Sequence, residues 1–138
     1  MIDKNGVLQF IKQNGLCVLA TANKNGKTES AVMAIATTDN GEILMSTEPN
    51  TRKIGNLSIN PLSSLLVGGV SSPSVQLDGE TIIASGSAAE EIKNQILVIH
   101  PETKDYLSKT AVFLKFIPKW LRYSDFSQNP PEILELVL

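Results

Sequence analysis

The sequence predicts a mainly β protein with a few short helices (class α+β), built as a small antiparallel barrel. About six or seven short apolar or alternating runs are separated by turn residues and follow one another in hairpin order. Strands and helices do not alternate, and no glycine fingerprint follows the first strand, which argues against a Rossmann sheet. The length of 138 residues predicts one domain spanning residues 1–138.

Composition narrows the class of partner. The chain is 42% hydrophobic and 19% charged, with a net charge of −2, so it lacks the basic balance of a nucleic-acid or acidic-membrane binder. Its N-terminus carries charges where a signal peptide has its apolar region, and no apolar run reaches the length of about 20 residues that spans a bilayer. We therefore expect a cytoplasmic protein with no nucleic-acid and no membrane partner. The single cysteine, Cys17, excludes an intramolecular disulfide and a cysteine-based structural zinc site.

The chain begins with a predicted helix and a buried strand. Asp3 is placed to cap the helix and Gly15 to end it, and the helix has an apolar face made of Val7, Leu8, Phe10 and Ile11. The run Leu16–Ala22 then has the continuous apolar character of a buried strand. Cys17 lies within this run, so we expect a buried structural thiol.

A hairpin is predicted next. Asn25-Gly26 is a strong turn signal, and the turn type that it favours needs positive φ at both residues. The return strand, Thr28–Thr37, alternates, with Ala31, Met33 and Ile35 expected on one face. A second turn at Thr38–Gly41 leads into a strand that ends at Ser46 and Thr47.

The second half of the chain predicts further strands and a helical segment. Strand-like runs occupy "LSSLLVGG", "SVQLDG" and "ETIIASGSAAE", with turn residues between them. Residues 89–107 have a helical pattern that Pro101 divides into two short helices. "AVFLKFIP" and "KWLRYSDF" suggest a last hairpin that bends at Pro118, and the apolar end of "SQNPPEILELVL" suggests a contact with a partner subunit.

Two cations stand at the start of a predicted short helix. Asn50 or Thr51 is placed to cap a helix that ends near Ile59, so Arg52 and Lys53 fall in its first turn. This placement is unfavourable, because the helix N-terminus already carries a partial positive charge. A bound phosphate would reconcile these features, since free N–H groups, a guanidinium, an ammonium and hydroxyls are all phosphate ligands. The alternative is a solvated pair of cations on an exposed turn.

Residues 19–67 resemble flavin-binding split-barrel proteins related to pyridoxamine 5′-phosphate oxidase. The likeness rests on Thr51-Arg52-Lys53, Asn56-Leu57 and Asn60-Pro61 after a strand that ends in hydroxyl residues, and it extends from about residue 15 to residue 125. It implies an antiparallel split β-barrel and a homodimer with FMN bound at the subunit interface. It places the phosphate at Arg52 and Lys53, with the other cofactor-binding positions at Met33, Ala34, Ser46, Thr47, Thr51 and Gln76.

The resemblance implies a flavin-dependent oxidoreductase that acts on an unknown small molecule or electron donor, with no assigned catalytic side chain. Pyridoxamine phosphate oxidase activity itself is not expected. The oxidase has an arginine where this chain has Ala31, a tryptophan where it has Ser124, and a terminal substrate-binding segment with arginine and histidine that this chain lacks after Arg122. The alternatives are a non-catalytic flavin-binding, electron-transfer or stress-related protein, or the same barrel with a deazaflavin or haem. Haem ligation would depend on His100, the only histidine, and no metal site is predicted.

Overall fold

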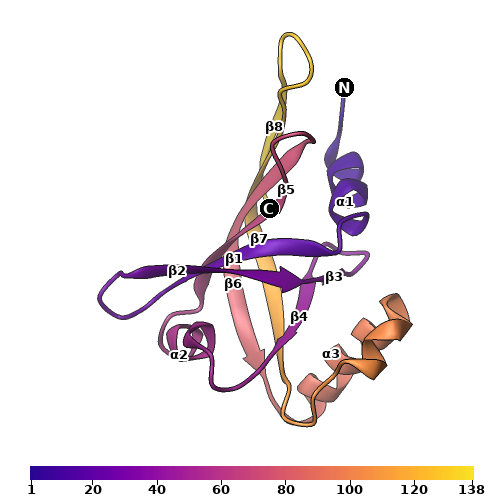
Figure 1. Ribbon diagram of the computed structural model, residues 1–138. Coiled ribbons are helices and arrows are strands. Elements are labelled where there is room, and N and C mark those ends of the chain that lie inside the picture. Colours follow the sequence, from indigo (N-terminus) through magenta and orange to yellow (C-terminus); the bar gives the residue numbers. More distant parts are fainter.

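The computed structural model describes all residues, 1–138, and contains one eight-stranded antiparallel sheet (Figure 1). The strands are β1 (Leu16–Ala22), β2 (Thr28–Ala34), β3 (Ala36–Thr37), β4 (Ile43–Thr47), β5 (Leu62–Gly68), β6 (Ser74–Ala84), β7 (Val112–Asp125) and β8 (Glu132–Val137). The helices are α1 (Lys4–Lys12), α2 (Arg52–Ile59), α3 (Gly86–Ile99) and the 3₁₀ helix η1 (Pro101–Asp105).

The sheet has the order β2-β1-β5-β6-β7-β4-β3, and β8 also pairs with β7. The long strand β7 pairs with β6 on one side, while its other side pairs with β4 in its first half and with β8 in its second half. In Figure 1, β1 and β2 run across β6 and β7 rather than alongside them, so the sheet curls over on itself. The predicted antiparallel barrel with short helices is confirmed.

Two apolar clusters hold the fold together. The larger one lies inside the curled sheet and contains 17 buried residues, among them Val7 and Ile11 of α1 and Phe116 of β7. The smaller one packs Ile92 and Ile96 of α3 against the outside of the sheet near β4. As predicted, α1 is capped by Asp3, whose carboxylate accepts a hydrogen bond of 2.9 Å from the Gly6 N–H.

The predicted hairpin at Pro118 is wrong, because residues 112–125 form the single strand β7. The two runs on either side of Gly79 are likewise one strand, β6. Gly79 lies opposite Pro118, and Asp78 lies opposite Trp120, so Lys119 is an extra residue in β7. A bulge at this position tolerates a proline, which lacks the N–H that a regular ladder requires.

The first hairpin turn also differs from the prediction. Gly26 has a φ of +80°, but no residue other than glycine has positive φ, so Asn25 does not. The Asn23 side chain accepts hydrogen bonds from the N–H groups of Asn25 and Lys27 and fixes this longer turn. The return strand alternates as expected, with Met33 buried and Val32 exposed, but it is interrupted at Ile35 and continues as β3.

The last part of the chain is more regular than the sequence suggested. Helix α3 begins at Gly86, three residues before the predicted start, and Pro101 separates it from η1 as predicted. The apolar tail forms β8 on the chain's own β7, and Leu136 packs against the larger cluster. Leu134 packs there as well, so two of the five large apolar residues of the tail are accounted for within one chain, while Ile133, Val137 and Leu138 are exposed. None of the helices is long and apolar enough to cross a bilayer.

Candidate functional site

A cavity of about 310 Å³ lies where β2, β4 and the first turn of α2 meet. It is lined by Val32, Met33, Ala34, Ser46, Thr47, Glu48, Lys53, Tyr106, Leu107, Ser108 and Ala111. Five of the eight cofactor-binding positions predicted from the sequence are therefore brought together: Met33, Ala34, Ser46, Thr47 and Lys53. They come from three elements, which shows that the curled sheet, and not a single loop, forms this site.

The start of α2 is left uncapped beside this cavity. Thr51 occupies the N-cap position, but its side chain makes no capping hydrogen bond and donates instead to the Glu48 carbonyl at 3.1 Å. The first backbone bond within the helix is donated by the N–H of Gly55 to the Thr51 carbonyl. The N–H groups of the first turn are thus available to an anion.

Lys53 is the cation that lines the cavity. It takes part in none of the four ion pairs of the structure, which involve Lys12, Arg52, His100 and Lys115. Glu48 is the only carboxylate among the lining residues, and it accepts a hydrogen bond of 2.8 Å from the Thr110 hydroxyl. The cavity therefore joins one free ammonium, the hydroxyl groups of Ser46 and Thr47, and an uncapped helix start.

Arg52 does not line the cavity. Its Nη1 lies 2.9 Å from Oε2 of Glu29 on β2, and its side chain is 77% exposed. This ion pair offsets the unfavourable position of a cation at a helix start. Glu29 could not be identified from the sequence, because nothing in its neighbourhood distinguishes it from any other polar residue on an exposed strand.

Gln76 lies on β6, away from the lining residues but on the outer face of the same sheet. It pairs with Leu66, Leu66 pairs with Val18, and Val18 pairs with Val32 at the cavity. Gln76 and Val32 are both exposed, so a row of side chains on the outer face connects them across four strands. Contact between Gln76 and a ligand in the cavity remains a prediction.

The segment after η1 supplies a wall of the cavity that was not predicted from the sequence. Tyr106, Leu107, Ser108 and Ala111 line it, and the Tyr106 side chain is 82% exposed. The only signal for this wall is an aromatic residue at the end of a helical segment. Its approach to β2 and β4 depends on how α3 packs, which is a tertiary feature.

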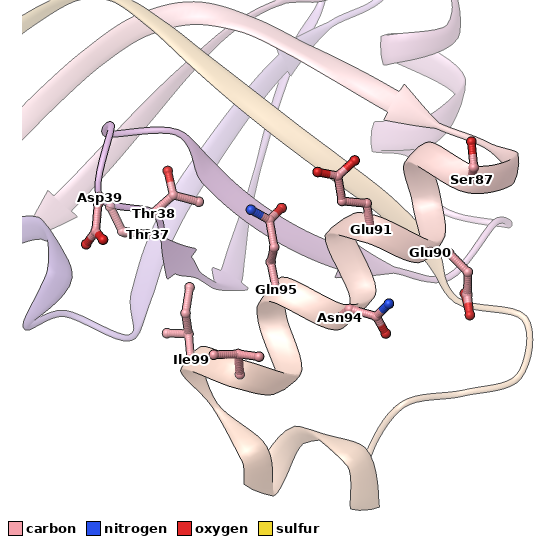
Figure 2. Close-up of a pocket in the computed structure, with 10 residues that line it drawn as sticks. Thr37, Thr38, Asp39, Ser87, Glu90, Glu91, Asn94, Gln95 and Ile99 are labelled. Atoms are coloured by element: carbon pink, nitrogen blue, oxygen red, sulfur yellow. The ribbon is translucent and has the colours of Figure 1, made fainter.

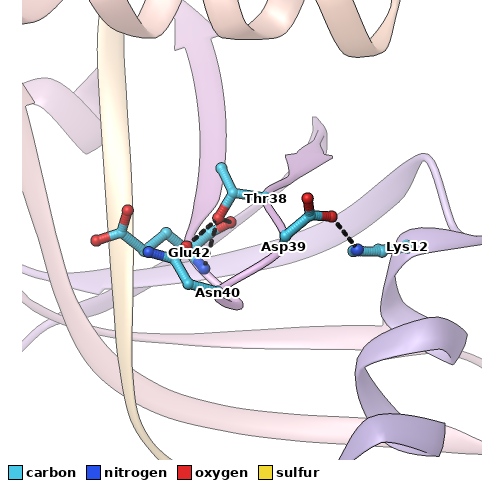
Figure 3. Close-up of polar contacts among 5 residues, drawn as sticks. All are labelled: Lys12, Thr38, Asp39, Asn40 and Glu42. Atoms are coloured by element: carbon cyan, nitrogen blue, oxygen red, sulfur yellow. Dashed lines mark hydrogen bonds and ion pairs between the residues drawn. The ribbon is translucent and has the colours of Figure 1, made fainter.

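A larger cavity of about 670 Å³ has the wrong charge for a phosphate. It lies between α3 and the turn between β3 and β4, and Figure 2 shows Glu91 and Gln95 on the side of α3 that faces Thr38 and Asp39. Glu90 adds a third carboxylate. The turn is held by its own polar contacts: Asp39 forms an ion pair with Lys12, and the Thr38 hydroxyl bonds Asn40 and the backbone of Glu42 (Figure 3).

Cys17 is a buried thiol, as predicted, with 3% of its surface exposed. Burial raises the pKa of Cys17 from 9.0 to about 12, because the thiolate would lose its hydration.

We expect the Cys17 thiol not to react with a thiol reagent at pH 8 until the protein unfolds, as measured with and without denaturant. The unfolded thiol ionises first, so the free energy of unfolding should fall as the pH rises from 9 towards 12. Rapid labelling of the native protein would contradict this burial.

Comparison with known proteins agrees with the fold. The family model for pyridoxamine 5′-phosphate oxidase matches residues 4–125. No curated protein sequence matches the chain. Among solved structures, General Stress Protein 26 from Bacillus anthracis str. Sterne is 24% identical, with a TM-score of 0.70, over 94% of this chain and 95% of that one.

Two other solved structures share the fold at lower identity. A pyridoxamine 5′-phosphate oxidase-related, FMN-binding protein from Nostoc punctiforme PCC 73102 is 9% identical, with a TM-score of 0.71, over 98% of this chain and 96% of that one. A heme-binding protein from Mycobacterium smegmatis is 12% identical, with a TM-score of 0.77, over 99% of this chain and 59% of that one. Because the family match spans most of the sequence, the chain belongs to the pyridoxamine 5′-phosphate oxidase family and has its split-barrel fold.

Proposed function

We propose that this protein binds FMN in the cavity at the start of α2 and acts as a flavin-dependent oxidoreductase on a small molecule. The observation that carries the proposal is the meeting of an uncapped helix start, the Lys53 ammonium and the hydroxyl residues Ser46 and Thr47 in one cavity. Each of these groups is a phosphate ligand. Family membership supports the same ligand, since the family includes FMN-binding proteins such as the one from Nostoc punctiforme.

Within this proposal the chain binds and orients the cofactor. Lys53 and the first-turn N–H groups of α2 hold the phosphate, and Ser46 and Thr47 donate hydrogen bonds around it. Met33 and Ala34 on β2 provide an apolar surface for the flavin ring, and Tyr106 shields the opening of the cavity. The flavin, when bound, supplies the redox chemistry, and no side chain of the cavity is required as an acid or base.

We also propose that a second copy of the chain completes the site. Ligand pockets usually measure about 300–1,000 Å³, so the cavity of about 310 Å³ in one chain is at the small end for a whole flavin nucleotide. The outer face of the sheet beside it carries exposed apolar side chains, with Val32 70%, Leu16 60% and Leu66 41% exposed. Apolar patches of this kind are typical of protein interfaces.

Val32→Glu is expected to convert the dimer to a monomer, because it puts a charge into this apolar face at its most exposed sheet residue. Sizing by light scattering at several protein concentrations measures the change. Val70→Glu is the matched control, since Val70 is fully exposed in the loop between β5 and β6. A wild-type protein that stays monomeric, or a Val32→Glu variant that stays dimeric, would contradict this interface.

The geometry favours FMN over haem. The ring of His100 is engaged on both sides: Nε2 lies 3.1 Å from the Ile35 carbonyl oxygen, and Nδ1 lies 3.5 Å from Oε1 of Glu102. His100 is not among the residues that line the cavity. A haem ligand at this position would have to give up both contacts.

The absorption spectrum of the purified protein, before and after addition of FMN and gel filtration, tests the proposal. Flavin bands that elute with the protein are expected, and their loss on the column would contradict FMN binding. A haem Soret band would instead point to His100. Reduction of the bound flavin by NADH or NADPH would support an oxidoreductase, whereas tight FMN binding without reduction by either would favour a flavin-binding or electron-transfer protein.

A further inference from the structure

Arg52 and Glu29 form a contact that the proposed site does not explain. Arg52 is the first residue of α2, next to Lys53 at the cavity, yet its guanidinium points to Glu29 on β2. The Arg52 side chain is 77% exposed and the Glu29 side chain is 25% exposed. The guanidinium is therefore the member of the pair with room to move.

Glu29 is held in place from its other side. The buried Asn56 of α2 donates hydrogen bonds to the Thr21 hydroxyl at 3.0 Å and to Oε1 of Glu29 at 3.5 Å. Oε2 of Glu29 accepts the bond from Arg52. Each carboxylate oxygen thus has its own donor, one from Asn56 and one from Arg52.

These contacts keep Glu29 charged. The hydrogen bond from Arg52 is the main cause that lowers the pKa of Glu29, and Asn56, the Arg52 charge and Lys27 lower it further. A carboxylate and a phosphate both accept hydrogen bonds from the N–H groups along the edge of a guanidinium. Glu29 therefore offers Arg52 the same kind of partner that a flavin phosphate would offer.

We propose that Glu29 is an internal competitor that holds Arg52 away from the FMN phosphate, so that binding requires Arg52 to exchange Glu29 for the ligand. This inference rests on the proposed function of the cavity. The exchange replaces one charge-assisted contact by another, so Arg52 adds less to the affinity for FMN than a free arginine would. Glu29 sets the affinity and keeps the binding reversible.

The opposite role would be a support, in which Glu29 orients Arg52 towards the phosphate. The two roles predict opposite changes in FMN affinity when Glu29 is replaced. A competitor weakens FMN binding, so its removal strengthens binding, whereas the removal of a support weakens binding. Glu29→Gln separates the two roles, because it removes the charge and keeps the size and the oxygen that accepts from Asn56.

The experiment is a double-mutant cycle with four proteins: wild type, Glu29→Gln, Arg52→Ala and the double variant. FMN is titrated into each one, and the change in flavin fluorescence gives Kd. Glu91→Gln on α3 is the control for the loss of one negative charge, and thermal unfolding checks that each variant is folded. We expect Glu29→Gln to lower Kd about three- to tenfold when Arg52 is present and to leave Kd unchanged in the Arg52→Ala background.

A Kd that rises or stays the same in Glu29→Gln would overturn the competitor role while leaving FMN binding intact. The same gain in FMN affinity with Arg52 present and in the Arg52→Ala background, or in Glu91→Gln, would also overturn the competitor role, because the loss of one negative charge would then explain the gain. Wild-type protein that binds no FMN at all would overturn the proposed function, and the competitor role with it.

Discussion

Replacement of Lys53 by alanine is expected to weaken FMN binding by about 1.5–3 kcal/mol, which is about ten- to a hundredfold in Kd. Lys53 is the cation at the cavity, and it has no ion-pair partner within the chain. Its charge-assisted bond to a phosphate would therefore replace no protein contact. A fluorescence titration with FMN measures the loss.

Lys24→Ala is the matched control for this variant, because Lys24 is an exposed lysine in the turn between β1 and β2. Riboflavin, which has the same ring and no phosphate, gives a second control. Lys53→Ala should leave the affinity for riboflavin unchanged. Equal Kd values for FMN in Lys53→Ala and Lys24→Ala would show that the phosphate does not bind at the start of α2.

The first strand could be predicted because its signals are local. Leu16–Ala22 has the same bounds in the sequence prediction and in the structure, since an apolar run flanked by Gly15 and polar residues defines both ends. The bulge in β7 could not be predicted in this way. Pro118 is a turn signal in a single sequence, and only the pairing with Gly79 on β6 explains how one strand continues through it.

The residues of the candidate site could likewise be predicted only in part. Hydroxyl residues, two cations and a helix start follow one another within Ser46–Lys53, and this pattern is visible in the sequence. Five of the residues predicted to bind the cofactor line the cavity. The direction of each side chain in the first turn of α2 was not predictable. Consecutive residues of a helix point to different sides, so Lys53 faces the cavity while Arg52 faces Glu29, which is 23 residues away in the sequence.

Gly79→Ala is expected to lower the free energy of unfolding by about 2–4 kcal/mol, which corresponds to a fall of about 7–14 °C in Tm for a domain of this size. A Cβ atom at this position would lie 2.1 Å from the backbone oxygen of Ile117 and 2.9 Å from Cζ of the fully buried Phe116. Backbone oxygen cannot rotate away as the end of a side chain can, so β6 and β7 would have to separate. Thermal and urea unfolding measure the loss.

Gly55→Ala is the control, because Gly55 is exposed within α2 and a Cβ atom there would meet nothing within 4 Å. It should raise stability by about 0.5–1 kcal/mol, since alanine restricts the unfolded chain and favours the helix. If the Gly79→Ala variant unfolds at the wild-type temperature, β6 and β7 do not approach closely at this position. The sequence-based hairpin at Pro118 would then be the better description, because a bend there would remove the Ile117 oxygen from Gly79.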